Sequence, residues 1–293
     1  MKKRRGSVWV MLLIVGLIIF LALAAYAIST LLDYRKGQEE YDGLRQTIEQ
    51  PASTAGATFV PKTYYVNPAQ GSSTYAVIDG ASSAAQATTQ PGITPEKRLS
   101  QTIDFAALQE INTDVVGWVT LDGTNIDYPI VQGTDDTYYL THTFRGAQSK
   151  SGCVFLGHIY DSAFGEENSV LYGHHMKDGT MFRDLVLYKD KAFFDEHLTG
   201  RLYTPDGDYL LNVFSAYIIY DDATFQRSGF GDETTTNAFY DELVRRSAVK
   251  APFTPRWPQQ ILTLVTCTYE YDDARYIVHA LMTPVAEAGS ILQ

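Results

Sequence analysis

The chain has 293 residues, 45% of them hydrophobic, and a formal net charge of −11 at pH 7. This length fits one large domain or two small ones, and the apolar share is enough for a real core. The acidic balance, with no basic stretch beyond the first few residues, argues against binding along a nucleic-acid backbone, which requires a cationic face. The only cysteines are Cys153 and Cys267, too few for a disulfide scaffold but compatible with one disulfide, or with one buried and one reactive thiol.

The N-terminus carries the signature of a membrane anchor. Basic residues from Lys2 to Arg5 precede an uncharged run from Val8 to about Ile28. About 20 apolar residues suffice to cross a hydrocarbon core as a helix. A cleaved signal peptide is the alternative, since LALAAYA resembles a cleavage site, but its apolar region would be shorter. We therefore predict a retained single-pass anchor with the N-terminus inside and the rest of the chain outside, because the basic residues precede the run.

The next segments predict a helix and then a spacer. Residues 31–50 mix apolar and charged side chains and predict a helical continuation that Pro51 ends. Residues 51–98 are rich in Ala, Ser, Thr, Gly, Pro and Gln, which is typical of a flexible spacer. We expect everything before about residue 98 to be dispensable for chemistry in solution. The predicted division is a basic tail and anchor in 1–30, an extracellular helix and spacer in 31–98, and a folded domain in 99–293.

The folded domain reads as mostly β. It opens with helical spacing of apolar residues from Ile103 to Ile111. Helices are also predicted for 180–197 and for 234–250, the latter opened by threonine N-cap candidates. Short β-forming runs punctuated by Gly, Asp and Asn favour a barrel or sandwich. These runs are GWVTL, IDYPIV, GCVFLG, NSVLYGH, GRLYTP, DYLLNVFSAYII, QQILTLVTCTY and ARYIVHALM.

Two features stand out as able to carry chemistry. Cys267 ends the apolar run ILTLVTC, where a thiol can project from a rigid strand into a groove, although a buried structural cysteine is the alternative. The adjacent pair His174 and His175 follows a strand-like run. Neighbouring residues of a strand face opposite sides, so the pair does not make a metal site by itself. We expect no metal and no cofactor, because no metal-binding motif supports one.

The motifs resemble those of the sortase family of cysteine transpeptidases. TLVTC at 263–267 matches the TLxTC signature, Arg275 follows eight residues after the cysteine, and NSVLYGHHMKDGTMF at 168–182 resembles the segment around the sortase histidine. The resemblance covers roughly residues 102–283. It implies a sortase catalytic domain with Cys267 as nucleophile, His174 as general acid/base and Arg275 as transition-state stabiliser.

Class B sortases resemble the chain in further respects. They carry YGHH followed by a turn and MF, have N-terminal helices before the barrel, and insert a long helix between late strands, which 234–250 fits. The expected fold is thus a sortase-like β-barrel with these helices, preceded by a single transmembrane helix. The chain departs from the family at VFLGHIYD, where IFLDYR is common, and at Val265, and both departures bear on substrate preference.

The resemblance also implies substrates and partners. The enzyme would cleave a sorting motif after Thr, form a thioester, and transfer the protein to an amine of cell-wall peptidoglycan. Class B suggests a motif of the NPxTx or SPxTx kind. Leu140, Tyr172 and Thr266 match substrate-groove positions, with core packing as the alternative, and Cys153 is expected to be a buried small hydrophobe.

Two other functions stay open. One is a sortase that polymerises pilins. The other is an inactive membrane-tethered binding module of the same fold, against which the intact Cys267, His174 and Arg275 argue. Strand alternation and the resemblance together select His174 over His175 as the residue that faces Cys267.

Overall fold

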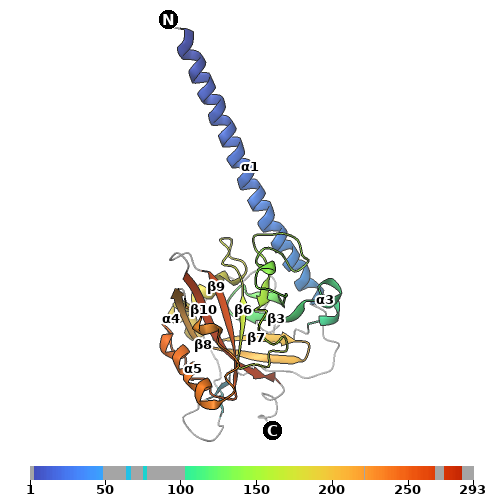
Figure 1. Ribbon diagram of the computed structural model, residues 1–293, viewed down its shortest axis with the longest axis vertical. Helices are drawn as coiled ribbons and strands as arrows, with labels where there is room; N and C mark the ends of the chain where they lie inside the picture. Colours follow the sequence, from blue (N-terminus) through green and yellow to red (C-terminus); the bar gives the residue numbers. More distant parts are fainter. Residues whose placement is uncertain are drawn as a thin grey trace.

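A closed barrel of eight strands forms the body of the molecule (Figure 1). The computed structural model describes residues 3–48, 64–66, 75–77, 103–220, 222–267 and 274–285. Around the barrel the strand order is β10-β8-β7-β3-β4-β5-β6-β9, and β10 pairs with β9 to close it. The barrel strands are β3 (Val115–Leu121), β4 (Asp127–Val131), β5 (Val154–Leu156), β6 (Asn168–Tyr172), β7 (Thr199–Thr204), β8 (Gly207–Tyr220), β9 (Gln260–Cys267) and β10 (Ala274–Pro284).

The predicted mostly-β barrel is confirmed. Each of the eight apolar runs picked out in the sequence contributes one strand, because β-branched and aromatic residues pack well on a pleated surface. Most neighbours are antiparallel, but β4 with β5 and β6 with β9 are parallel. In the stretch predicted as a spacer, the two short strands β1 (Tyr64–Val66) and β2 (Tyr75–Val77) pair with each other, and the rest of 51–98 lies outside the described residues.

The helices refine the sequence-based expectations. Helix α3 (Phe105–Ile111) forms where the apolar spacing predicted it, capped by Asp104. The predicted helix at 180–197 is instead a 3-10 helix, η2 (Phe182–Lys189), followed by α4 (Lys191–Glu196). The break comes at Asp190, whose extended backbone ends η2 and whose carboxylate accepts from the first amides of α4. The short 3-10 helices η1 (Tyr138–Leu140) and η3 (Thr224–Gln226) sit in loops.

The long inserted helix is present between β8 and β9. It is α5 (Glu233–Arg246), shorter than the predicted 234–250. Its cap is Asp232, which accepts from the amide of Thr235 at 2.8 Å, and not a threonine as predicted. The helix ends at Arg246 because Ser247 takes an extended backbone and its hydroxyl bonds to the barrel strand β8 at Ala216.

Helix α1 (Lys3–Ile48) is continuous and has two distinct parts. Its first part projects away from the barrel in Figure 1, and its apolar side chains are exposed. Among the described residues, Trp9–Gln46 is the one helix long and apolar enough to cross a membrane, with a mean hydropathy of 2.9 over its most apolar window. Its last turns instead pack on the barrel, where Tyr41 and Leu44 join the hydrophobic core.

A buried polar chain crosses the core beneath the strands. The Thr263 hydroxyl lies 2.6 Å from the amide oxygen of Asn168, which can only accept, so Thr263 donates that hydrogen bond. Thr263 must then accept from Nδ1 of His279, 2.8 Å away, and Nε2 of His279 accepts from the Tyr217 hydroxyl at 3.0 Å. Nδ1 of His279 therefore carries a proton, and burial of the ring, which lowers its pKa, favours the neutral form in which Nε2 accepts. No local pattern in the chain indicated this role.

This arrangement makes the fold sensitive to acid. Burial lowers the pKa of His279 to about 3, well below the unfolded value, so the unfolded chain binds a proton first as the pH falls. The stabilisation is complete above about pH 6.5 and is lost progressively toward the folded pKa, by about 2 kcal/mol at pH 5. In the wild type, the free energy of unfolding measured with urea should fall as the pH is lowered from 7 to 4.5. We expect this fall to be smaller in His279→Gln. The matched variant of a partly exposed histidine outside this chain of hydrogen bonds, His142→Gln, should keep the wild-type slope. Equal slopes in wild type and His279→Gln would contradict this account.

Candidate active site

The parallel pairing of β6 and β9 brings the predicted histidine and cysteine to the same level. Tyr172 is the register partner of Val265, and the amide of Gly173 continues the ladder with a 3.1 Å hydrogen bond to the Val265 carbonyl. His174 and Cys267 each lie two residues beyond this pair. Because paired strands run about 4.8 Å apart, this register brings the two residues to the same end of the barrel, although they are far apart in sequence.

The antiparallel pairing of β9 and β10 adds the predicted arginine. Arg275 is the direct cross-strand partner of Cys267. Directly opposed residues of an antiparallel pair share a face of the sheet, with Cβ atoms about 5 Å apart. Cys267 is thus flanked by His174 on one neighbouring segment and by Arg275 on the other. Arg275 is exposed at the start of its strand. Asp272 and Asp273, which precede it in the chain, lie outside the described residues.

The imidazole of His174 is held by a backbone carbonyl. Its Nε2 lies 2.7 Å from the carbonyl oxygen of Leu140, the last residue of η1. Since a carbonyl oxygen only accepts, Nε2 carries a proton, and in the neutral ring Nδ1 is the basic nitrogen. The predicted groove residue Leu140 thus meets His174 through its backbone, while its side chain is 37% exposed.

The structure distinguishes His174 from His175 by the turn that follows β6, and not by the strand alternation assumed from the sequence. Strand β6 ends at Tyr172, so neither histidine lies within a regular strand and simple alternation does not apply. The carbonyl of His174 accepts from the amide of Phe182 at 2.9 Å, and His175 forms a single bridge with Met181. The pair therefore opens a tight turn that closes at residues 181–182.

Tyr172 stands beside these residues on β6. It is half-buried, stacks on Phe155, and its hydroxyl accepts from the Gln226 side-chain amide at 2.8 Å. Burial raises the pKa of Tyr172, and the nearby Arg275 guanidinium opposes that rise. Gln226 was missed in the sequence, because a loop residue 54 positions away carries no signal of its contact.

Two other residues named from the sequence lie in packed surroundings. Thr266 is only 2% exposed, so its predicted role in substrate binding gains no support from the structure. Cys153 is a free thiol, 1% exposed, and burial raises its pKa to about 12. Its predicted place as a buried small hydrophobe is where the structure puts it. Among the described residues, no cluster of three or more His, Cys, Asp or Glu side chains could hold a metal ion.

Comparisons with known proteins identify the barrel. The family model of the sortase domain matches residues 119–283, more than half of the chain. Sortase B of Listeria monocytogenes is 32% identical over 173 residues, which are 58% of this chain and 70% of that protein. Sortase B of Staphylococcus aureus is also 32% identical, over 184 residues that cover 62% of this chain and 75% of the relative.

Solved structures agree in fold. A crystal structure of Staphylococcus aureus sortase B matches with a TM-score of 0.58 at 32% identity, covering 61% of this chain and 86% of that one. A sortase B from Bacillus anthracis matches with a TM-score of 0.64 at 27% identity, covering 87% of this chain and 99% of that one. The chain belongs to the sortase family of cysteine transpeptidases, and to its class B.

Proposed function

We propose that the chain is a membrane-anchored sortase that cleaves a sorting motif after Thr and joins the cleaved protein to an amine of cell-wall peptidoglycan. The observation that supports this proposal is the strand register: Cys267 pairs with Arg275 on β10, and it lies two residues beyond Val265, the partner of Tyr172, which precedes His174 by two residues. A nucleophilic cysteine needs a proton-transfer group and a polarising group close by in space, and this arrangement supplies both.

The proposed first half-reaction forms a thioester. The Cys267 thiol passes its proton to Nδ1 of His174, and the resulting thiolate attacks the Thr carbonyl carbon of the sorting motif, so that negative charge develops on the carbonyl oxygen. The guanidinium of Arg275 can donate hydrogen bonds to that oxyanion, an effect often worth about 3 kcal/mol for one donor. When the intermediate collapses, the C–N bond breaks, and His174 gives its proton to the departing amine.

The second half-reaction reverses these roles. The incoming amine attacks the thioester carbonyl, His174 takes a proton from it, and the C–S bond breaks to release the Cys267 thiolate and a new amide. Since Nε2–H of His174 donates its hydrogen bond to the Leu140 carbonyl, we assign both proton transfers to Nδ1. Imidazole is the side chain best suited to proton transfer in both directions near neutral pH.

The length of α1 and the basic residues before its apolar stretch support the proposed anchor and topology. At 1.5 Å per residue, its apolar stretch from Trp9 to Ile28 spans about 30 Å, the thickness of a hydrocarbon core. Lys2 to Arg5 precede this stretch, which puts the N-terminus inside and the barrel outside the cell.

The proposed substrates are proteins with a motif of the NPxTx or SPxTx kind, and the acceptor is a cross-bridge or stem-peptide amine. Support comes from solved relatives: one structure is a Staphylococcus aureus sortase B–substrate complex, and another is a sortase B complexed with triglycine. An NPxTx peptide with triglycine as acceptor is therefore the first substrate pair to assay.

The thiol assignment has a direct test. We expect Cys267→Ala to abolish cleavage and transfer, and mass spectrometry of the wild type with an NPxTx peptide library to show an acyl-enzyme that is absent from the variant. The matched control Cys153→Ala removes the other thiol, which is buried and protonated at neutral pH, and should leave turnover intact. An acyl-enzyme that persists in Cys267→Ala would overturn the assignment, and covalent pilin ladders made by the wild type would favour a pilin-polymerising enzyme instead.

The two histidines are separable by the same assay. We expect His174→Ala to lower turnover by about 100-fold or more, as loss of a general acid/base does. His175→Ala should cost far less and act through the packing of the turn. Near-normal turnover in His174→Ala with a collapse in His175→Ala would reverse the assignment.

A further inference from the structure

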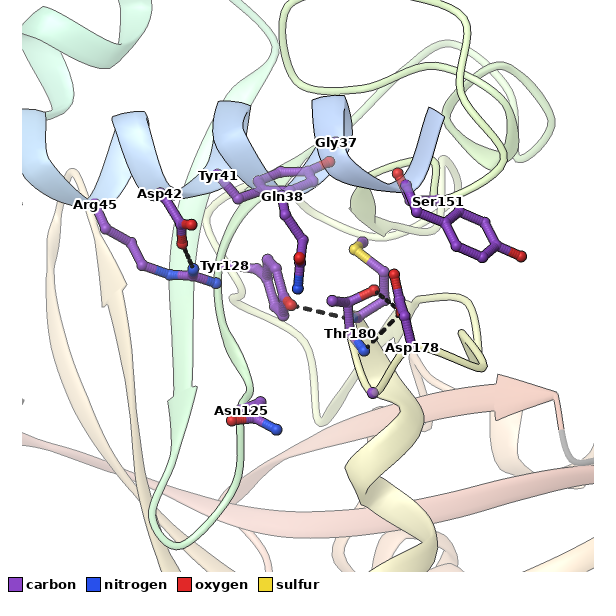
Figure 2. Close-up of a pocket in the computed structure, with 13 residues that line it drawn as sticks. Gly37, Gln38, Tyr41, Asp42, Arg45, Asn125, Tyr128, Ser151, Asp178 and Thr180 are labelled. Atoms are coloured by element: carbon purple, nitrogen blue, oxygen red, sulfur yellow. Dashed lines mark hydrogen bonds and ion pairs between the residues drawn. The ribbon is translucent and has the colours of Figure 1, made fainter. Parts of the chain in front are cut away.

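The last turns of α1 are connected to both segments that hold His174. One is the turn that follows His174 and closes at Met181 and Phe182. The other is η1, whose Leu140 carbonyl binds the imidazole. Figure 2 shows this region: α1 lies across Tyr128 and the turn at 178–181, with a cavity of about 220 Å³ between them.

The first connection runs through two tyrosines. The rings of Tyr41 and Tyr128 meet edge to face, with centroids 5.2 Å apart. The hydroxyl of Tyr128 accepts from the backbone amide of Met181 at 2.9 Å, the hydrogen bond drawn in Figure 2. Both residues are only 3% exposed, so this contact is buried between α1 and the barrel. The position of α1 is thereby transmitted to the backbone of the turn.

The turn needs such support at Met181. This residue has φ +57° and ψ −134°, a conformation that glycine adopts freely and other residues rarely do. Strained residues persist only where their surroundings fix them, and they gather at functional sites. The adjacent amide, of Phe182, binds the carbonyl of His174 at 2.9 Å. A shift at Met181 therefore moves His174 directly.

The second connection starts from the hydroxyl of Tyr41. It donates to the carbonyl of Gly152 at 2.6 Å. Gly152 packs directly on η1, since a Cβ there would lie 2.8 Å from the Leu140 carbonyl oxygen. That oxygen is the acceptor for His174. One side chain of α1 thus steadies both the turn that carries His174 and the carbonyl that sets its tautomer.

Arg45, one turn further along α1, secures this contact. Its guanidinium lies over the Tyr128 ring, 5.0 Å from the centroid, and its Nε donates to the Asp127 carbonyl at 3.0 Å. The Asp127 carboxylate in turn accepts from the indole of Trp118 at 2.7 Å, which ties α1 to the barrel core.

We propose that Tyr41 and Tyr128 are positioning residues for His174, so that the membrane helix is part of the support of the active site. The proposal rests on the function proposed for His174. It replaces the expectation that everything before residue 98 is dispensable: the docked turns of α1 support catalysis, and only residues after them can act as a spacer. The predicted domain boundary near residue 99 remains a separate prediction about folding.

The test uses the full-length protein in detergent. Tyr128→Phe removes the acceptor for the Met181 amide, and Tyr41→Phe removes the donor to Gly152. Tyr34→Phe is the matched control, because Tyr34 lies two turns before Tyr41 on the same face of α1 and makes neither contact. We expect kcat with an NPxTx peptide and triglycine to fall about tenfold in Tyr128→Phe and Tyr41→Phe, with KM within about twofold, because a small misplacement of a reacting group is costly. Tyr34→Phe should match wild type.

A second readout follows His174 itself. In protein with isotope-labelled histidine, the His174 imidazole signals, assigned by their loss in His174→Gln, should report the Nε2–H tautomer in wild type and Tyr34→Phe. They should shift toward a mixture of tautomers in the other two variants. A fall in kcat with unchanged His174 signals would mean that the tyrosines stabilise the fold without positioning His174, which contradicts the proposal. Unchanged kcat in both variants would also overturn it. A wild type without transfer activity but with the predicted signals would defeat the proposed function alone.

Discussion

The pairing of β9 with its two neighbours governs the geometry of the site. The strand is paired in parallel with β6 on one edge and antiparallel with β10 on the other. The parallel edge sets His174 level with Cys267, and the antiparallel edge sets Arg275 directly opposite. On the β10 edge, a register shift of one residue would turn the partner of Cys267 to the other face of the sheet. The buried chain from Asn168 through Thr263 to His279 joins these same three strands and helps to fix that register.

The histidine depends on a different kind of support. It lies beyond the end of β6, so backbone hydrogen bonds of the barrel no longer hold it. Its place is fixed by the Leu140 carbonyl on one side and by the turn at Met181 on the other. The two proton transfers proposed for His174 would benefit from a fixed tautomer, because the same nitrogen would then face both amines.

The apolar part of α1 is joined to the barrel by continuous helix. Helix α1 runs continuously from the apolar stretch to the turns that pack on the barrel, and the stretch predicted as a spacer comes only afterwards. Further contacts reach back toward the apolar part: Lys150 lies over the Tyr26 ring at 5.3 Å, and its amide binds the Asp33 carboxylate. The proposed consequence is that the helix, and not the spacer, sets the height and orientation of the active site above the membrane.

The barrel class, the eight strands, the apolar helix and the choice of Cys267, His174 and Arg275 as residues to examine were all predictable from the chain alone. They were predictable because β-forming runs and the TLVTC and YGHH motifs are local patterns. The segment at 180–197 and the cap of α5 were misjudged, because Asp190 and Asp232 compete for amides in ways that periodicity does not reveal. Three further features became visible only in the folded molecule. They are the hydrogen bond from Gln226 to Tyr172, the buried hydrogen bond of His279 with Tyr217, and the contacts of Tyr41 with the two segments that hold His174. Each of these contacts joins residues more than fifty positions apart, and such contacts are fixed by packing and register and not by neighbours in the chain.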